Sequence, residues 1–413
     1  MFTDSQNKQI ELLRQRSLIT AILGLVLTII GGLLIGFLGD VGLAKVFQPL
    51  TIAFMIVFGL SIGSLALMML HHLCGGSWSF VILRITEAGS RTLPVFFGVA
   101  AVILLGAAWL TNFYPWTDAT YLAENYTIKY KAPFLNLPVF TITFLACFSI
   151  WLFLSKFFTS GSRRLDTVED ESTVLWLIRL SGPGIILFVL TITIASTHWT
   201  MSLEPNWFST IYAVWLIGGY ALTIVAFCAI VLSYLKDAPG YEQLVSKKHF
   251  HHLGNFLLGF TIFWAYTSFS QFLIIWSGNI PDPISFYLRR SDGGLVFLTV
   301  FMIVFVWIVP MFLLLMRENK TNHITLRYIA YYVLVMRVVD IYWNIAPSFP
   351  DHHNRINLFT LLLTLTALAG LCGLWLWVFL GELKKQPLLP QHDPRKAGYF
   401  LHQDGEHHAK SSA

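Results

Sequence analysis

The chain has 413 residues, of which 56% are hydrophobic and only 12% are charged, and its formal net charge is +5. Soluble domains carry about 25% charged residues, so this composition excludes a large soluble domain and indicates a polytopic membrane protein. We expect the excess of Lys and Arg in loops on one side of the membrane, and we do not interpret it as a nucleic-acid-binding surface.

Ten apolar stretches are each long enough to cross a bilayer core, which needs about 20 helical residues. In chain order they cover residues 17–38, 48–70, 93–111, 137–158, 174–197, 207–234, 253–276, 294–316, 324–344 and 358–380. Lipid cannot satisfy free backbone polar groups, and no barrel-like alternation is visible, so the sequence predicts an all-α fold. The predicted organisation is an N-terminal segment at 1–16, a ten-helix transmembrane domain at 17–381 and a tail at 382–413.

The orientation follows from the distribution of positive charge. An even number of spans places both termini on one side of the membrane. Most of the 27 Lys and Arg residues fall on that side, in the termini and in the loops after the second, fourth, sixth and eighth stretches. The positive-inside rule therefore predicts that both termini are cytoplasmic. The C-terminal tail is polar and contains several Pro and His residues, so we expect it to extend over the cytoplasmic surface or to be disordered.

A charged cluster is predicted where the second stretch meets the third. The joining segment, 75–92, is amphipathic, and spacings of three and four residues place Arg84, Glu87 and Arg91 on one helical face. His71 and His72 immediately precede this segment. The cluster is interpreted either as a solvated interfacial patch of salt bridges or as a proton-uptake site, in which His and Glu exchange protons near neutral pH.

The fifth stretch carries two further candidate residues. Arg179 precedes Gly182-Pro183-Gly184, a sequence that predicts a kink with freed backbone carbonyls. Arg179 either snorkels to the interface or bridges those carbonyls or a carboxylate. His198 lies at the predicted external end of the same stretch.

Arg337 and Asp340 are predicted on one face of the ninth span, in its external half. A charge at the centre of a bilayer costs about 3 kcal/mol or more, so an embedded ionisable residue is a functional hypothesis by default. One interpretation is a structural ion pair that fixes this helix against its neighbours. The other is a proton relay or part of a site for a quinol headgroup.

No cofactor site can be identified from the residues. The four Cys residues are scattered without a C-x-x-C motif, which argues against zinc, an iron–sulfur cluster or attached haem. Apart from His198, the His residues, including His352 and His353, fall at or beyond the predicted helix ends, so a bis-His haem is not expected. We therefore predict that this chain has no catalytic residue of its own and binds neither a metal nor a redox cofactor.

Residues 71–97, HHLCGGSWSFVILRITEAGSRTLPVFF, resemble the F subunit of bacterial alternative complex III, a quinol oxidoreductase that reduces cytochrome c or high-potential iron–sulfur protein. The family pattern is roughly H-H-L-x-G-G-x-W, a basic-rich stretch with E-A, and R-T-L-P. The matching residues are His71, His72, Gly75, Gly76, Trp78, Glu87, Ala88, Arg91, Thr92 and Pro94. The sequence KAPFLN at 131–136 is a second family-like stretch.

The resemblance implies membership of the wider polysulfide-reductase (NrfD-type) group of membrane subunits. Their core would consist of two four-helix bundles, spans 2–5 and 6–9, with spans 1 and 10 outside. It also implies an inner-membrane subunit that supports a paralogous quinol-binding subunit and conducts protons. Iron–sulfur and multihaem cytochrome c subunits would be its partners, and these partners would hold the iron–sulfur clusters, the haem c and the quinol, such as menaquinol. The chain lacks the histidine-rich motif of the quinol-binding subunit.

In this interpretation Arg337 and Asp340 belong to the external half of a proton path. The internal entrance and further candidates are His71, His72, Glu87, Arg91, Arg84, Arg179 and His198. Two alternatives remain open. A stand-alone secondary transporter would suit broken helices and midplane charges, although the sequence shows no matched pair of broken spans. A purely structural anchor would tolerate replacement of Asp340 by Asn without loss of turnover or proton release.

Overall fold

The computed structural model describes residues 3–38, 42–349 and 357–399, and within these ranges every regular element is helical. Long single helices form most of the structure: α1 (Asp4–Leu38), α2 (Ala44–Cys74), α9 (Leu137–Arg164), α10 (Glu171–Trp199), α11 (Tyr212–Leu235), α12 (Lys247–Gly278), α17 (His323–Ile345) and α18 (Leu358–Leu383). The all-α prediction is confirmed for the described residues.

Two of the predicted spans consist of consecutive segments with a π-helical insert. The third comprises α5 (Leu93–Ala100), η1 (Ala101–Leu105) and α6 (Gly106–Leu110), preceded by α4 (Leu83–Ser90), and the eighth comprises α14 (Leu295–Phe301), η4 (Met302–Ile308) and α15 (Val309–Leu315). The connections contain α3 (Ser77–Phe80), η2 (Pro115–Thr117), α7 (Ala119–Glu124), α8 (Tyr126–Lys131), η3 (Met201–Leu203), α13 (Pro281–Ser291), α16 (Arg317–Thr321) and η5 (Ala346–Ser348).

In the described part of the chain, nine helices are long and apolar enough to cross a membrane. This confirms a polytopic membrane protein but not the predicted count of ten. The predicted span that is not among these nine helices is α17. It is long enough, at 23 residues, but it carries Arg327, Arg337 and Asp340. Its charges lower its hydropathy, although it packs against α11 and α2 in the same bundle.

Polar caps set several helix boundaries. Asn136 Oδ1 accepts a hydrogen bond from the Val139 amide at the start of α9 (2.9 Å), and the Asp170 side chain caps α10 in the same way. Asn322 and Asn357 cap α17 and α18. A side-chain oxygen at this position satisfies backbone N–H groups that have no partner inside the helix. The segment Gly182-Pro183-Gly184, where the sequence predicts a kink, lies inside α10, which continues through Pro183.

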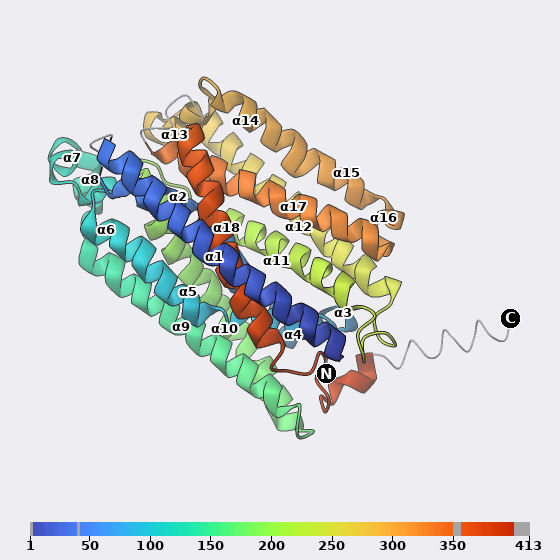
Figure 1. Cartoon of the computed structure of the whole chain (residues 1–413). Helices are drawn as coiled ribbons and strands as arrows, with labels where there is room; N and C mark the ends of the chain where they lie inside the picture. The colour runs from blue at the N-terminus through green and yellow to red at the C-terminus, as the bar shows by residue number, and fades with distance from the viewer. Residues whose placement is uncertain (1–2, 39–41, 350–356, 400–413) are drawn as a thin grey trace.

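The centre of the bundle is formed by α2 and α11, whose most apolar windows are 89% and 78% buried. Contacts join α2 to α4, α9, α10, α11 and α17, and α11 to α12 and α17. In contrast, α1 and α18 lie side by side along the outside of the bundle and pack on α2 (Figure 1). Small residues allow this close approach, since a Cβ on Gly24 of α1 would lie 2.5 Å from the Gly370 nitrogen of α18.

The start of α1 meets the end of α18 at one end of the bundle (Figure 1), where Lys384 Nζ donates to Glu11 Oε2 (2.8 Å). We call this end the terminal face; α3 and the end of α9 also lie there. The opposite end, which carries α7, α8 and α13, is called the loop face.

Candidate functional site

The first buried group of charges lies at the terminal face and is centred on Arg84. Gly75 and Gly76, with φ of 67° and 106°, turn the chain at the end of α2, so that α3 and α4 fold back against the bundle. Arg84 Nη1 donates to Glu87 Oε2 (2.6 Å) and to Ser162 Oγ (3.2 Å), and Arg84 Nη2 binds Asp166.

This group is enclosed by protein, with Arg84 only 1% exposed and Glu87 completely buried. The interpretation of the cluster as a solvated patch is therefore wrong for these two residues. Removing charges from water is expensive unless they are paired and hydrogen-bonded, and here one guanidinium serves two carboxylates. Burial raises the pKa of Asp166 above its ordinary value, although Arg84 opposes that shift.

Arg91, predicted on the same helical face, binds a different carboxylate. Its Nε lies 2.5 Å from Glu382 Oε2 near the end of α18. The side-chain amide of Gln386 is oriented so that its nitrogen and its oxygen both have a partner. The nitrogen donates to Glu87 Oε2 (3.0 Å), and the oxygen accepts from Arg163 Nη2 (2.8 Å). Arg163 Nη2 also lies 3.8 Å from Glu382 Oε2. The structure therefore joins Arg91 to the Arg84–Glu87 pair through residues of α9 and the tail.

His71 and His72 lie beside this network at the end of α2, and each is 1% exposed. His71 Nδ1 is 2.7 Å from Ser79 Oγ, and the two imidazole rings are 5.0 Å apart. His72 Nδ1 is 3.4 Å from Arg395 Nη1 in the tail. The Nε2 atoms of both rings are buried without a hydrogen-bond partner among the described residues. We name His71, His72, Arg84, Glu87 and Asp166 the terminal-face cluster.

The C-terminal tail covers the terminal-face cluster. The Tyr241 hydroxyl lies 2.8 Å from the Val81 carbonyl and 3.1 Å from the Leu388 carbonyl, and the His392 amide donates to the Leu165 carbonyl (3.0 Å). The described part of the tail thus packs over the predicted cytoplasmic surface. Burial raises the pKa of Tyr241, so its hydroxyl stays protonated as a donor.

The second buried charge pair is Arg337 and Asp340 on α17. Arg337 Nη1 donates to Asp340 Oδ2, and the residues are only 2% and 1% exposed. The guanidinium lies against the Gly219 backbone of α11, where a Cβ atom would overlap it. Arg337 Nε and Asp340 Oδ1 have no hydrogen-bond partner among the described residues. The pair therefore faces the interior of the bundle and not the lipid.

A third group, at the loop face, was not found by sequence reasoning. It is centred on Arg290, a completely buried residue near the end of α13. Arg290 Nη1 donates to Glu204 Oε1 (3.1 Å), and Nη2 donates to the Asn344 carbonyl (2.5 Å). Ser348 Oγ donates to the same Glu204 oxygen (2.7 Å). Burial lowers the pKa of Arg290, and Glu204 opposes that shift.

Asn344 connects the last two groups because it lies one helical turn after Asp340, on the same face of α17. Asn344 Nδ2 lies 3.1 Å from the Tyr212 hydroxyl, which in turn donates to Thr200 Oγ1 (2.9 Å). Polar side chains therefore follow one another from Arg337 and Asp340 to the loop face, although no hydrogen bond joins Asp340 to Asn344 among the described residues. We call them the loop-face row, defined as Arg337, Asp340, Asn344, Tyr212, Thr200, Glu204 and Arg290.

Six aromatic rings pack against one another in the interior of the bundle. Phe58 of α2 lies 5.5 Å from Trp151, 5.6 Å from Trp199 and 6.3 Å from Tyr220, measured between ring centroids. Phe54 and Phe148 extend the same packing. We call these six residues the aromatic layer. On its terminal side, hydroxyl pairs continue from the cluster, with Ser90 Oγ and Ser155 Oγ 3.2 Å apart.

Two predicted candidates lie outside these groups. Arg179 is exposed on α10. His198 is buried, but its ring is satisfied locally, with Nδ1 2.8 Å from Thr143 Oγ1 and Nε2 3.2 Å from the Phe134 carbonyl. His352 and His353 lie outside the described residues. Within the described part, no three His, Cys, Asp or Glu residues are placed to hold a metal ion together.

The fold and these sites define a polytopic helical membrane protein with buried charges at both ends of its bundle. A comparison with protein-family models finds no match to this chain, and a comparison with curated proteins finds none either.

Proposed function

We propose that this chain is a proton-conducting membrane subunit of a quinol-oxidising electron-transfer complex of the alternative complex III type. The observation that carries the proposal is the loop-face row, which gives the Arg337–Asp340 pair a polar route toward one membrane surface. A carboxylate inside the bundle beside such a route is suited to taking up and releasing protons.

The two polar regions act as half-paths in this proposal. The terminal-face cluster receives protons from the cytoplasm, and the loop-face row delivers them to the external side. The aromatic layer keeps the halves apart, because its closely packed rings leave no room for the continuous chain of water that a proton needs. Protons then cross only when Tyr220 or a neighbouring ring moves, and electron transfer in partner subunits supplies the energy for that movement.

The complex enters the proposal through the resemblance of residues 71–97. On this basis the chain lies in the bacterial inner membrane with both termini in the cytoplasm. It has ten spans, with α17 as the ninth, arranged as two four-helix bundles and two outer helices. The packing of α1 and α18 outside α2 supports this arrangement. A paralogous quinol-binding subunit, an iron–sulfur subunit and multihaem cytochrome c subunits are the proposed partners.

A structural anchor is the second candidate, and a specific contact favours it. The Arg337 guanidinium fills the space above Gly219, so the charge pair also fixes α17 to α11.

A stand-alone transporter is favoured by another observation, the π-helical inserts η1 and η4 in the third and eighth predicted spans. Such inserts often occur at functional sites, and irregular helices line many transport sites.

The class of the protein is tested by mild-detergent purification of the tagged full chain from its native membrane. We expect iron–sulfur and multihaem cytochrome c subunits to co-purify, with haem visible in the absorption spectrum. A protein that purifies alone, and that shows substrate-dependent flux in vesicles, would contradict the proposal and support the transporter.

A further inference from the structure

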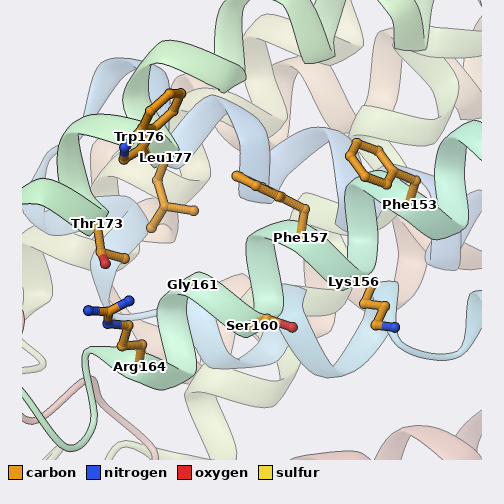
Figure 2. Close-up of a pocket in the computed structure, with 9 residues that line it drawn as sticks. All are labelled: Phe153, Lys156, Phe157, Ser160, Gly161, Arg164, Thr173, Trp176 and Leu177. Atoms are coloured by element: carbon orange, nitrogen blue, oxygen red, sulfur yellow. The ribbon is translucent and has the colours of Figure 1, made fainter.

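A groove of about 760 Å³ runs between α9 and α10 near the terminal face (Figure 2). Its apolar walls are Phe153 and Phe157 from α9 and Trp176 and Leu177 from α10. Phe153 and Trp176 are 61% and 62% exposed. Gly161 lets Leu177 pack close against α9 at the floor of the groove, since a Cβ there would lie 2.9 Å from Leu177 Cδ2. The groove is therefore open to the lipid and wide enough for a hydrocarbon chain.

The same groove carries a line of polar side chains. Lys156, Ser160 and Arg164 are spaced by four residues along α9 and share one helical face. Arg164 points toward Thr173 of α10 (Figure 2), and its side chain is 66% exposed. Lys156 is also exposed and forms no ion pair within the described residues. The groove thus combines apolar walls with two accessible cations.

The carboxylate that pairs with Arg164 is already engaged in capping α10. Asp170 Oδ2 lies 3.1 Å from Arg164 Nη2, and it also accepts from the Thr173 hydroxyl (2.7 Å). Asp170 Oδ1 accepts hydrogen bonds from the Ser172 and Thr173 amides (3.0 and 3.3 Å) as the cap of α10. Asp170 therefore offsets the positive charge of Arg164 but does not pair with Lys156. The residues that line the groove keep a net positive charge.

We infer that this groove is a binding site for one anionic phospholipid. Its phosphate binds Arg164, Ser160 and Lys156, and an acyl chain lies along the aromatic walls. Arg164 marks the end of α9 at the membrane boundary, and Lys156 lies about 12 Å deeper along the helix axis. In Figure 2 the Lys156 amine points away from Arg164, so in this proposal the bound phosphate draws the flexible Lys side chain toward the interface and supplies the missing negative charge. A partner helix would instead need a carboxylate opposite Lys156.

The test uses the full chain purified in a neutral detergent and examined by native mass spectrometry after addition of phosphatidylglycerol or phosphatidylcholine. We expect one tightly retained phosphatidylglycerol and about tenfold weaker retention of phosphatidylcholine. The double variant Lys156→Gln/Arg164→Gln should lose the preference, whereas Arg16→Gln, which removes an exposed cation on α1, should keep it. Excess inorganic phosphate should not displace the lipid, because it lacks an acyl chain.

Equal retention of the two lipids by the unaltered chain would overturn the inference, and this result does not depend on any variant folding. An unchanged preference in the double variant would place the lipid elsewhere. Displacement by inorganic phosphate would show an anion site without acyl recognition. Binding that disappears when the complex is assembled would show that a partner protein covers the groove.

Discussion

The guanidinium of Arg337 lies directly against the backbone of Gly219, so that these two residues hold α17 and α11 in register. No other residue type fits at Gly219 without displacing the charged group. Sequence inspection placed Arg337 and Asp340 on one helical face, but it could not show which neighbouring helix would receive them.

This relationship predicts the effect of Gly219→Ala. A helix interior ordinarily gains about 1 kcal/mol from this change, but overpacking a buried contact costs about 1–3 kcal/mol. We expect the thermal unfolding midpoint in detergent to fall. Gly182→Ala in α10 is the matched control, because no atom lies within 4 Å of the added Cβ, and it should leave the midpoint unchanged or raise it. Equal effects of the two substitutions would show that Arg337 does not occupy the space above Gly219.

The charge pair itself predicts strong coupling between its two residues. Arg337→Gln or Asp340→Asn alone leaves one uncompensated buried charge, which costs about 3–5 kcal/mol. The double variant removes both charges and should recover most of that loss. Thermal unfolding of the four proteins forms a double-mutant cycle, and additive effects would mean that the two side chains do not interact.

Tyr241→Phe should loosen the tail from the terminal-face cluster. The variant loses the hydroxyl that contacts the Val81 and Leu388 carbonyls, a loss worth about 1 kcal/mol for one buried hydrogen bond. Hydrogen exchange of residues 386–393 should become faster, whereas the exposed Tyr266→Phe should have no effect there. Unchanged exchange in Tyr241→Phe would show that the tail is held by its other contacts.

The cap of α10 predicts a pH dependence at low pH. Hydrogen bonds from Ser172 and Thr173 lower the pKa of Asp170 to about 2. Because the pKa of Asp170 is lower in the folded chain, its carboxylate stabilises the fold at pH values above its ordinary pKa of 3.8. This contribution is lost as the pH falls through about 2. Asp170→Ala should therefore lower the unfolding midpoint at pH 6 and match the unaltered chain at pH 2. A difference that stays constant between these pH values would contradict this assignment.

The sequence predicted much of the fold because hydrophobic length and polar caps are local properties. All ten predicted stretches overlap helices or helix segments, and Arg84 and Glu87, predicted on one helical face, form an ion pair there. Arg290 was missed because its partners, Glu204 and Asn344, come from distant segments. Its only local signal was a basic residue at the end of the amphipathic segment 281–291.

The burial of the terminal-face cluster was missed for a related reason. The polar composition of the tail suggested exposure or disorder, yet Leu388 and Leu389 are buried in the described part of the chain. The contact of Leu388 with Tyr241 and that of His392 with Leu165 depend on how the loops fold at that face, which local periodicity does not encode.

The central claim is that Asp340 carries protons for the complex, and Asp340→Asn tests it most directly. The variant should be purified within the assembled complex and placed in vesicles, where quinol turnover and proton release are measured together. Because this variant is also expected to be less stable, only assembled complexes are compared, and in them we predict that proton release per quinol falls about a hundredfold or more, the range expected when a proton-transfer group is removed. Glu318→Gln on the exposed α16 is the control. Unchanged proton release per quinol in Asp340→Asn would contradict the account and leave Asp340 as a structural partner of Arg337.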